Sequence, residues 1–449
     1  MKKYVLLLLF FFNTTTFAQS LRNTENPAIL NVSLLSEITA KGQKITAVAL
    51  EYEDDLLAGN NLKTLYQVKT SLDQQELQER TLLKAYSNHR PERSEKPQQG
   101  RFVIIELAQD DPNADVYQLN KANETPLTVR EKNAEGQIIY TQKVQVSRVP
   151  QYYQQRLIYH INQTGNLPLV NGKTVLPTQA KQSAERKNII TPFIDQFTSH
   201  RIYLNTPDNQ LLYRLYTPLS AQQKYPLTIF LHGSGQVGKD NLAQLLSSKG
   251  AISTLAYEQG FVLAPQYQTP FDPFDNVEKG QPGGIHWQTD NRQQLLLKMI
   301  DQTLANNPNI DTDRIYLIGL SRGAEGALNL LLKRPHFFAG ALLLSGREAH
   351  SLEWIDGNAT KDNLASIQHI PIWFIHSKED KIAPVTGTQK NYQILRSLNA
   401  PFVKYNELTF QQVGDNGIIN NNAHNSWDMA FDSPAVMNWL LQQKRTIKE

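Results

Sequence analysis

The sequence predicts two domains of different class: an N-terminal all-β sandwich of immunoglobulin-like type, and a C-terminal α/β domain with a mostly parallel, doubly wound sheet. Three observations predict this. The first part of the chain contains short β-rich segments and no convincing amphipathic helix, a stretch rich in Gly, Pro, Gln, Lys and Ser follows, and apolar strands then alternate with helical patterns. The length of 449 residues also exceeds one ordinary domain of about 150 residues.

The first 18 residues have the pattern of a secretory signal peptide. Lys2 and Lys3 precede an apolar run over residues 4–12, and small residues stand at Thr16 and Ala18, the two positions that a signal peptidase reads. A membrane anchor is the alternative, but a helix needs about 20 apolar residues to cross a bilayer. We therefore expect cleavage after residue 18 and an exported protein, periplasmic or extracellular.

Residues 19–166 are expected to form the immunoglobulin-like domain. Seven segments rich in β-branched and aromatic residues are separated by turn-forming stretches. They are ITAVALEY (45–52), LYQVKT (65–70), TLLKAYSN (81–88), RFVIIELA (101–108), PLTVREK (126–132), IIYTQKVQV (138–146) and RLIYHINQ (156–163). Residues 167–190, with little periodicity, are predicted to be a linker.

Residues 191–449 are expected to form the α/β domain. Its strands are nearly continuous in apolar residues, as in LTIFLHG, FVLAPQY, RIYLIGLS, FAGALLLSG and PIWFIHS. A parallel sheet that is covered by helices on both faces requires such strands. The segments RQQLLLKMIDQTLANN and GTQKNYQILRSLN repeat their apolar residues at helical spacing.

Charge and cysteine content exclude several classes of protein. The chain has 45 Lys and Arg against 42 Asp and Glu, and two of the lysines lie in the signal peptide, so the mature chain is close to neutral. This balance argues against a nucleic-acid or anionic-lipid partner. The chain has no cysteine, hence no disulfide and no thiol nucleophile.

The segment YLIGLSRGAEGAL, residues 316–328, places Ser321 between Gly319 and Gly323 where a strand meets a helix. In this G-x-S-x-G context the glycines allow a strained turn that exposes the serine hydroxyl at the carboxyl edge of the sheet. The helix that follows favours developing negative charge. The alternative is a small residue that merely fits a tight turn.

A serine nucleophile needs a base, and the base needs an acid that fixes its tautomer. In α/β-hydrolases the order along the chain is Ser, then Asp or Glu, then His. Asp380 follows the strand PIWFIHS and is the predicted acid, with Glu379 as the fallback. His424 is the only histidine after Asp380 and is therefore the predicted base.

The oxyanion of a tetrahedral intermediate needs backbone donors. One is expected from Arg322, the residue after the nucleophile, and the other from the loop after LTIFL, where we assign Ser234, with Gly235 or Gln236 as alternatives. His232 is expected to be buried and to brace this loop. The spacing of His286, His350 and His376 suggests no metal site, and no cofactor is expected.

Three further residues, Trp287, Arg347 and Glu348, each allow two interpretations, one functional and one structural. Trp287 follows a Gly-rich segment and either stacks on a sugar or aromatic acyl group or fills the core. Arg347 and Glu348 follow the strand FAGALLLSG, where a loop facing the substrate would lie, but a surface ion pair is the favoured interpretation.

The motifs YPLTIFLHGSGQVGKDN, VLAPQ, IDTDRIYLIGLSRGAEGAL, IHSKEDKIAPV and HNSWDMAF resemble the secreted bacterial α/β-hydrolase esterases that carry an N-terminal immunoglobulin-like domain. These are often labelled predicted peptidases and lie near the feruloyl and polyhydroxybutyrate-depolymerase esterases. The resemblance covers about residues 195–445, and more weakly the N-terminal half.

This resemblance implies the same triad of Ser321, Asp380 and His424. It further implies that Gln266 and Trp287 line the site and that Asp240 and Asn241 shape the oxyanion loop. The chain departs from the group in a long polar loop, residues 411–422.

We therefore expect an exported serine carboxylesterase for short-chain or phenolic esters of acetyl or feruloyl type, including esters carried on polysaccharide. One alternative is a serine peptidase on the same fold. Another is a surface-binding protein that has lost catalysis. The N-terminal domain is a candidate module for adhesion or homo-oligomer formation.

Overall fold

The computed structural model describes residues 29–445, apart from residues 60, 133, 134, 136, 154–155, 221–222, 271, 275–285 and 351–356. The predicted signal peptide lies outside the described residues. The described residues divide into two compact units, the first comprising residues 29–35, 47–113 and 156–189 apart from the gap at residue 60, and the second the other described residues. Within the described part of the chain, no helix is both long and apolar enough to cross a membrane.

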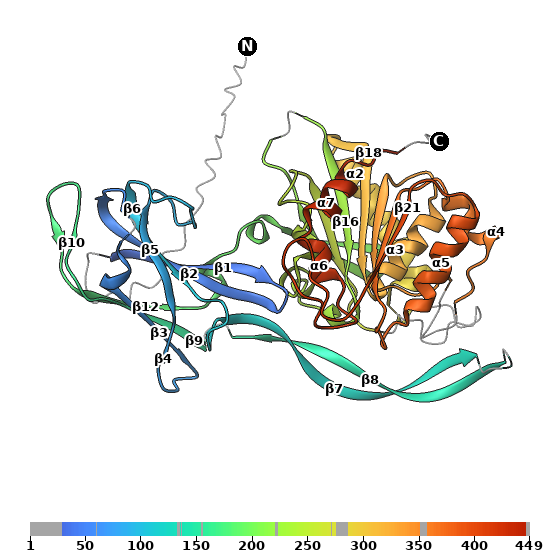
Figure 1. The fold of residues 1–449 in the computed structure, drawn as a ribbon, viewed down its shortest axis with the longest axis horizontal. Coiled ribbons are helices and arrows are strands. Elements are labelled where there is room, and N and C mark those ends of the chain that lie inside the picture. Colours follow the sequence, from blue (N-terminus) through green and yellow to red (C-terminus); the bar gives the residue numbers. More distant parts are fainter. Residues whose placement is uncertain are drawn as a thin grey trace, which may run out of the picture. The chain divides into compact units, whose positions relative to one another are not determined.

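The first unit is a sandwich of antiparallel strands. One sheet has the order β2-β6-β5 and the other β12-β9-β3-β4 (Figure 1). In β9 every second residue is buried, which is the pattern expected of a strand with one face on the core. The unit contains β3 (Tyr66–Leu72), β4 (Gln78–Glu79), β5 (Leu82–Asn88), β6 (Gly100–Leu107), β9 (Leu157–Gln163), β10 (Leu167–Pro168), β11 (Thr174–Val175), β12 (Thr178–Ser183), η1 (Lys63–Leu65) and η2 (Arg186–Asn188). The unit boundaries fall within β1 (Ile29–Thr39), β2 (Gly42–Leu56) and β13 (Ile189–Ile190).

Two segments differ from the sequence-based expectation. Residues 167–190, predicted to be a linker, include β12, which pairs with β9 and buries Thr178 and Ala180. The polar composition of β12 gave no strand signal in the sequence, because only its inward side chains face the core. Residues 126–132 and 138–146 belong to β7 (Asp115–Lys132) and β8 (Ile138–Tyr152), a long antiparallel hairpin that falls in the second unit. The domain boundaries stay a prediction.

The second unit is built on an eight-stranded sheet with the order β14-β15-β17-β16-β18-β19-β20-β21. The β14–β15 and β15–β17 pairs are antiparallel, and the pairs from β17 to β21 are parallel. The strands are β14 (Thr198–Leu204), β15 (Thr206–Tyr216), β16 (Tyr225–Leu231), β17 (Phe261–Gln266), β18 (Ile310–Leu320), β19 (Gly340–Leu344), β20 (Ile372–Ser377) and β21 (Val403–Leu408).

The helices of this unit are α1 (Ala243–Leu246), α2 (Asp290–Asn306), α3 (Arg322–Lys333), α4 (Lys361–Leu364), α5 (Val385–Ser397), α6 (Trp427–Phe431) and α7 (Pro434–Leu441). The unit also contains the short 3-10 helices η3 (Ile194–Gln196), η4 (Ser234–Gln236), η5 (Lys249–Ile252), η7 (His286–Gln288) and η8 (Ala365–Ile367).

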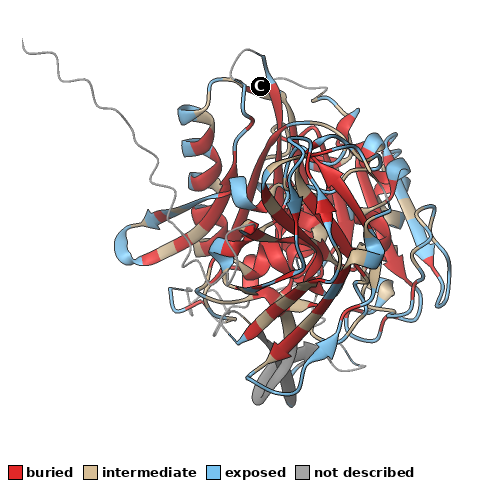
Figure 2. Cartoon of the chain, turned by 90° about the vertical axis from the view of Figure 1, so that its left-hand side faces the viewer, coloured by how far each residue is buried: buried red, intermediate tan, exposed pale blue. Residues whose placement is uncertain are grey.

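The sheet separates two apolar clusters, because successive strand residues point to opposite faces. Ile315 and Leu317 of β18 pack in one cluster with residues of α2, α3 and α5, whereas Tyr316 and Ile318 pack in the other with residues of α1, α6 and α7. The strands β16, β17, β19 and β20 are consequently buried on both sides, whereas the edge strands β14 and β21 are partly exposed (Figure 2). The sheet is therefore a rigid base whose carboxyl ends can hold functional loops.

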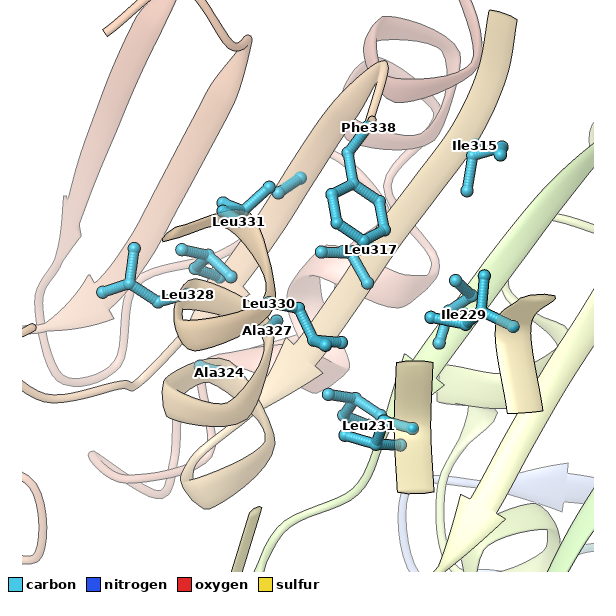
Figure 3. Packing of buried hydrophobic residues seen from close by; sticks show 14 of the residues in the cluster. Ile229, Leu231, Ile315, Leu317, Ala324, Ala327, Leu328, Leu330, Leu331 and Phe338 are labelled. Carbon is cyan, nitrogen blue, oxygen red and sulfur yellow. The ribbon is translucent and has the colours of Figure 1, made fainter. Parts of the chain in front are cut away.

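Helix α3 is fixed on this sheet by its apolar face. Ala324, Ala327 and Leu331 of α3 lie in the same cluster as Leu317 of β18 and Ile229 of β16 (Figure 3). Full burial of one such leucine stabilises the fold by roughly 1.5–3 kcal/mol. The start of α3 and the residue before it are thus held in place relative to the ends of β16 and β18.

Candidate active site

Ser321 stands in a sharp turn between β18 and α3. Its backbone lies in the left-handed region, with φ 51° and ψ −122°, which a non-glycine residue adopts only at a cost. The flanking glycines make the turn possible. A Cβ added to Gly319 would lie 2.3 Å from the carbonyl oxygen of Gly323. A Cβ added to Gly323 would lie 1.9 Å from the carbonyl oxygen of Leu231. Only glycine allows the helix to approach the strands this closely.

A continuous chain of hydrogen bonds connects Ser321, His424 and Asp380. The distance between Ser321 Oγ and His424 Nε2 is 3.0 Å, and that between His424 Nδ1 and Asp380 Oδ2 is 2.7 Å. A carboxylate only accepts hydrogen bonds, so Nδ1 carries the proton and Nε2 of the neutral ring accepts from the serine hydroxyl. The three residues come from the β18–α3 turn, the loop after β20 and the loop before α6.

The carboxylate of Asp380 receives four donors. Its Oδ1 accepts the N–H groups of Ile382 (2.8 Å) and Ala383 (3.0 Å), and its Oδ2 accepts from His424 and from His376 Nε2 (3.0 Å). Burial raises the pKa of Asp380, but the hydrogen bonds from the two histidines outweigh it, so the pKa lies well below the usual range. Asp380 is therefore a fixed, ionised acceptor.

His424 is held in its neutral form at neutral pH. Burial lowers the pKa of its imidazole, and the hydrogen bond to Asp380 opposes this effect only in part. A neutral imidazole with Nε2 directed at a hydroxyl is suited to accept a proton. The fallback acid, Glu379, is exposed and accepts from Ser377 Oγ and the N–H of Phe410 instead.

The predicted oxyanion loop forms the short turn η4. Ser234, Gly235 and Gln236 line one pocket together with Ser321. The N–H of Gln236 donates to the carbonyl of Gly233 at 3.2 Å. Because the N–H of Gln236 is already bonded, those of Ser234 and Gly235 are the better candidates for the second oxyanion donor.

Gln266 and Trp287 do not line the pocket, contrary to the expectation, because both are completely buried. Gln266 accepts from the N–H of Asn241 (2.6 Å) and donates to the carbonyl of Gln236 (2.9 Å). Trp287 Nε1 donates to the carbonyl of His232 at 2.8 Å. Both residues therefore support the oxyanion loop from behind, and Trp287 is a core residue.

His232 is completely buried, as expected of a brace. Its Nδ1 lies 2.6 Å from the carbonyl oxygen of Gly233, and its ring packs against Tyr267 and Trp287. Burial lowers the pKa of His232 to about 3. The ring is therefore neutral, so Nδ1 donates to the Gly233 carbonyl.

Arg347 and Glu348 do not form the expected surface pair. Arg347 is buried, and its guanidinium contacts Glu325 Oε1 (2.5 Å) and donates to the carbonyl of Ile382 (2.9 Å). Glu348 instead pairs with Lys390. Arg347 therefore links Glu325 of α3 to the loop that carries Asp380, whereas the second partner of Glu325, Arg322, lies in α3 itself.

The pocket over Ser321 has a volume of about 300 Å³. Its lining includes apolar side chains that were not predicted from the sequence. The lining residues are Leu119, Gly233, Ser234, Gly235, Gln236, Leu320, Ser321, Ile382, Asn422, His424, Asn425 and Trp427. Proximity to His424 in the motif HNSWDMAF could have suggested Asn425 and Trp427, whereas no local signal marked Leu119. Among the residues that the structure describes, no cluster of three or more His, Cys, Asp or Glu could hold a metal ion.

Two family models match the chain. Residues 31–176 match the esterase Ig-like N-terminal domain, and residues 270–416 match the phospholipase/carboxylesterase family. A search of curated proteins finds no match.

The crystal structure of a thermostable esterase aligns with 93% of this chain and 100% of its own, with 24% identity and a TM-score of 0.70. A ferulic acid esterase from Anaeromyces mucronatus, in complex with ferulic acid, covers 55% of this chain and 90% of its own at 17% identity and a TM-score of 0.41. An acylaminoacyl peptidase from Pyrococcus horikoshii aligns with 91% of this chain and 76% of its own, with 14% identity and a TM-score of 0.42. The first match and the two family models confirm an α/β-hydrolase fold with an N-terminal Ig-like domain.

Proposed function

We propose that this chain, a carboxylic ester hydrolase with an Ig-like N-terminal domain, is an exported serine carboxylesterase for short-chain or phenolic esters. Ser321 attacks the ester carbonyl while His424 takes the hydroxyl proton. His424 then returns this proton to the leaving alcohol, and an acyl-enzyme remains on Ser321. A water molecule, deprotonated by His424, cleaves the acyl-enzyme and releases the acid.

The observation that carries this proposal is the hydrogen-bonded chain from Ser321 through His424 to Asp380, with the serine at a strained, left-handed backbone position. Strain of this kind is retained where the surrounding structure supports a function. The lowered pKa of Asp380 keeps its charge, which stabilises the imidazolium that forms on His424 during the attack.

The oxyanion is stabilised by the backbone N–H of Arg322 and that of Ser234, with Gly235 as the alternative. The position of Arg322 at the first residue of α3 supports this role, since the start of a helix favours negative charge. Such donors are effective because they are fixed before the reaction begins.

The pocket favours a small substrate. A volume of about 300 Å³ lies at the lower end of the range for ligand pockets. Leu119, Ile382 and Trp427 give it apolar walls, which suit a short aliphatic or a phenolic group better than a charged one.

Export rests on the N-terminal sequence, in which two lysines precede an apolar run and small residues at positions 16 and 18. We further propose that the Ig-like domain is a module for adhesion or homo-oligomer formation, and that the second unit, which contains the eight-stranded sheet, is the catalytic part of the chain. Polysaccharide pull-down of the chain tests adhesion by the Ig-like domain, and size-exclusion chromatography tests homo-oligomer formation.

The test of the activity is hydrolysis of p-nitrophenyl acetate, butyrate and octanoate and methyl ferulate by the chain and its Ser321→Ala variant. The variant is expected to lose at least about 10³ of the rate on the best ester. Ser397→Ala, which removes an exposed hydroxyl at the end of α5, is the matched control and is expected to keep full activity. A faster reaction on the matched anilide than on the ester would indicate a peptidase, and equal activity of Ser321→Ala would refute the proposal.

A further inference from the structure

The β7–β8 hairpin contributes two side chains next to the candidate active site. Leu119 of β7 lines the pocket together with Ser321 and His424. Tyr152 of β8 donates from its hydroxyl to Asp240 Oδ2 at 2.6 Å. Both residues and the site belong to the same compact unit, although Leu119 and Tyr152 lie far from the catalytic residues in sequence. The hairpin is the two-stranded ribbon formed by β7 and β8 in Figure 1.

Asp240 is the junction between Tyr152 and the oxyanion loop. Its Oδ1 accepts from Gln266 Nε2 at 2.8 Å and from two backbone N–H groups at the start of α1, at 3.0 and 3.2 Å. The same Gln266 Nε2 donates to the carbonyl of Gln236. The hydroxyl of Tyr152 is therefore connected through two side chains to the end of η4, directly after the candidate donors Ser234 and Gly235.

Tyr152 is well placed to hold this junction rigid. Its ring packs on Tyr117, with centroids 5.0 Å apart, and Tyr117 is completely buried in an apolar cluster of the unit. The packing fixes the direction of the hydroxyl. A hydrogen bond to a carboxylate is also about twice as strong as one between neutral groups.

We propose that the hairpin is part of the catalytic machinery in two ways: Tyr152 is a positioning residue of the oxyanion loop, acting through Asp240, and Leu119 determines specificity as a wall of the ester pocket. The inference rests on the proposed function. Its physical basis is that oxyanion donors act only when held at hydrogen-bond distance, so a displacement of about 1 Å costs on the order of 100-fold in rate.

Tyr152→Phe tests the positioning role, because it removes the hydroxyl and keeps the ring on Tyr117. We expect kcat to fall about 10-fold while KM changes less than about 2-fold, since the loop is loosened but no donor is lost. Tyr153→Phe is the matched control. It removes the neighbouring hydroxyl, whose partner is Gln118, and is expected to keep the kcat of the parent. An unchanged kcat in Tyr152→Phe overturns the positioning role.

Hydrogen exchange provides a readout that needs no turnover. The N–H groups of Asn241, Leu242 and Ala243 all bond within this network. In Tyr152→Phe their exchange is expected to accelerate about 10-fold, and in Tyr153→Phe to match the parent. Faster exchange in a chain that hydrolyses no ester would support the brace while refuting the proposed function. Unchanged exchange overturns the brace even if the chain is an esterase.

Leu119→Ala tests the specificity role, with two ester series: p-nitrophenyl esters of increasing acyl length, and acetates of increasing alcohol size. In at least one series, the ratio of kcat/KM between the largest and the smallest member is expected to change about 10-fold. Leu83→Ala, at an exposed position of β5, is the control. Thermal unfolding verifies that both variants fold. Unchanged ratios, or no hydrolysis of any ester, overturn the role of Leu119, and only the second outcome also refutes the proposed function.

Discussion

Gly323→Ala is expected to damage the site without removing any functional group. An added Cβ would lie 1.9 Å from the carbonyl oxygen of Leu231 and 2.8 Å from that of His232. Contacts of a real Cβ below 3.0 Å essentially do not occur, so α3 and β16 must separate by about 1.1 Å. Both neighbours are backbone atoms of a buried strand end and cannot rotate away.

The expected magnitude follows from this displacement. Overpacking of this size costs about 1–3 kcal/mol of unfolding free energy. Ser321 lies two residues before Gly323, and its Oγ is 3.0 Å from His424 Nε2, so a shift of about 1 Å is expected to lower kcat about 100-fold.

The assay combines urea unfolding with ester hydrolysis, the latter at a temperature where the variant is fully folded. Gly59→Ala is the matched control, because its added Cβ would have only one neighbour within 4 Å, at 3.6 Å. The control is expected to keep the rate of the parent. A Gly323→Ala variant with a rate within about 3-fold of the parent would show that the close approach of α3 to β16 does not hold Ser321 in place.

Three further predictions follow from the charges of the site. Asp380→Asn is expected to lower kcat about 10⁴-fold in a folded protein, because an amide no longer enforces the tautomer of His424; steady-state kinetics measure this. Since burial lowers the pKa of His424, the acidic limb of kcat/KM is expected to have its midpoint below pH 6.5, as a pH–rate profile measures. His232 has a pKa of about 3 in the fold and about 6.5 when unfolded, so the unfolded chain binds more protons in acid. Between pH 7 and pH 5 this histidine is expected to remove about 2 kcal/mol of unfolding free energy, measured by urea unfolding.

Each of these predictions has a contradicting outcome. An Asp380→Asn variant within 10-fold of the parent would exclude Asp380 as the orienting acid. An acidic midpoint above pH 7 would mean that His424 is not held neutral by burial. A His232→Gln variant with the same dependence of stability on pH as the parent would show that His232 does not cause it.

The arrangement of the three candidate residues was predictable because a serine triad imposes an order on the chain. A nucleophile elbow between a strand and a helix, a carboxylate after a later strand and a single histidine beyond it leave few choices. Ser321, Asp380 and His424 were selected in this way, and the structure places them within hydrogen-bond distance. His376, which also donates to Asp380, was passed over because it was considered only as a metal ligand.

The walls of the pocket were not predictable from local patterns. Trp287 and Gln266 were expected at the site, but both side chains turn inward to satisfy backbone groups of the oxyanion loop. Leu119 contributes a wall through the pairing of β7 with β8, and such long-range pairing leaves no mark in the residues near Ser321. The strand β12 was assigned to a linker because its exposed half is polar.

Covalent labelling can identify the nucleophile of this chain. The chain is treated with a fluorophosphonate, and intact mass and peptide mapping locate the adduct. We expect one adduct per chain, on Ser321, with loss of ester hydrolysis in proportion to labelling, and no adduct in Ser321→Ala. Ester hydrolysis that persists in the fully labelled chain, or an adduct on another residue that accounts for the loss of activity, would exclude Ser321 as the nucleophile.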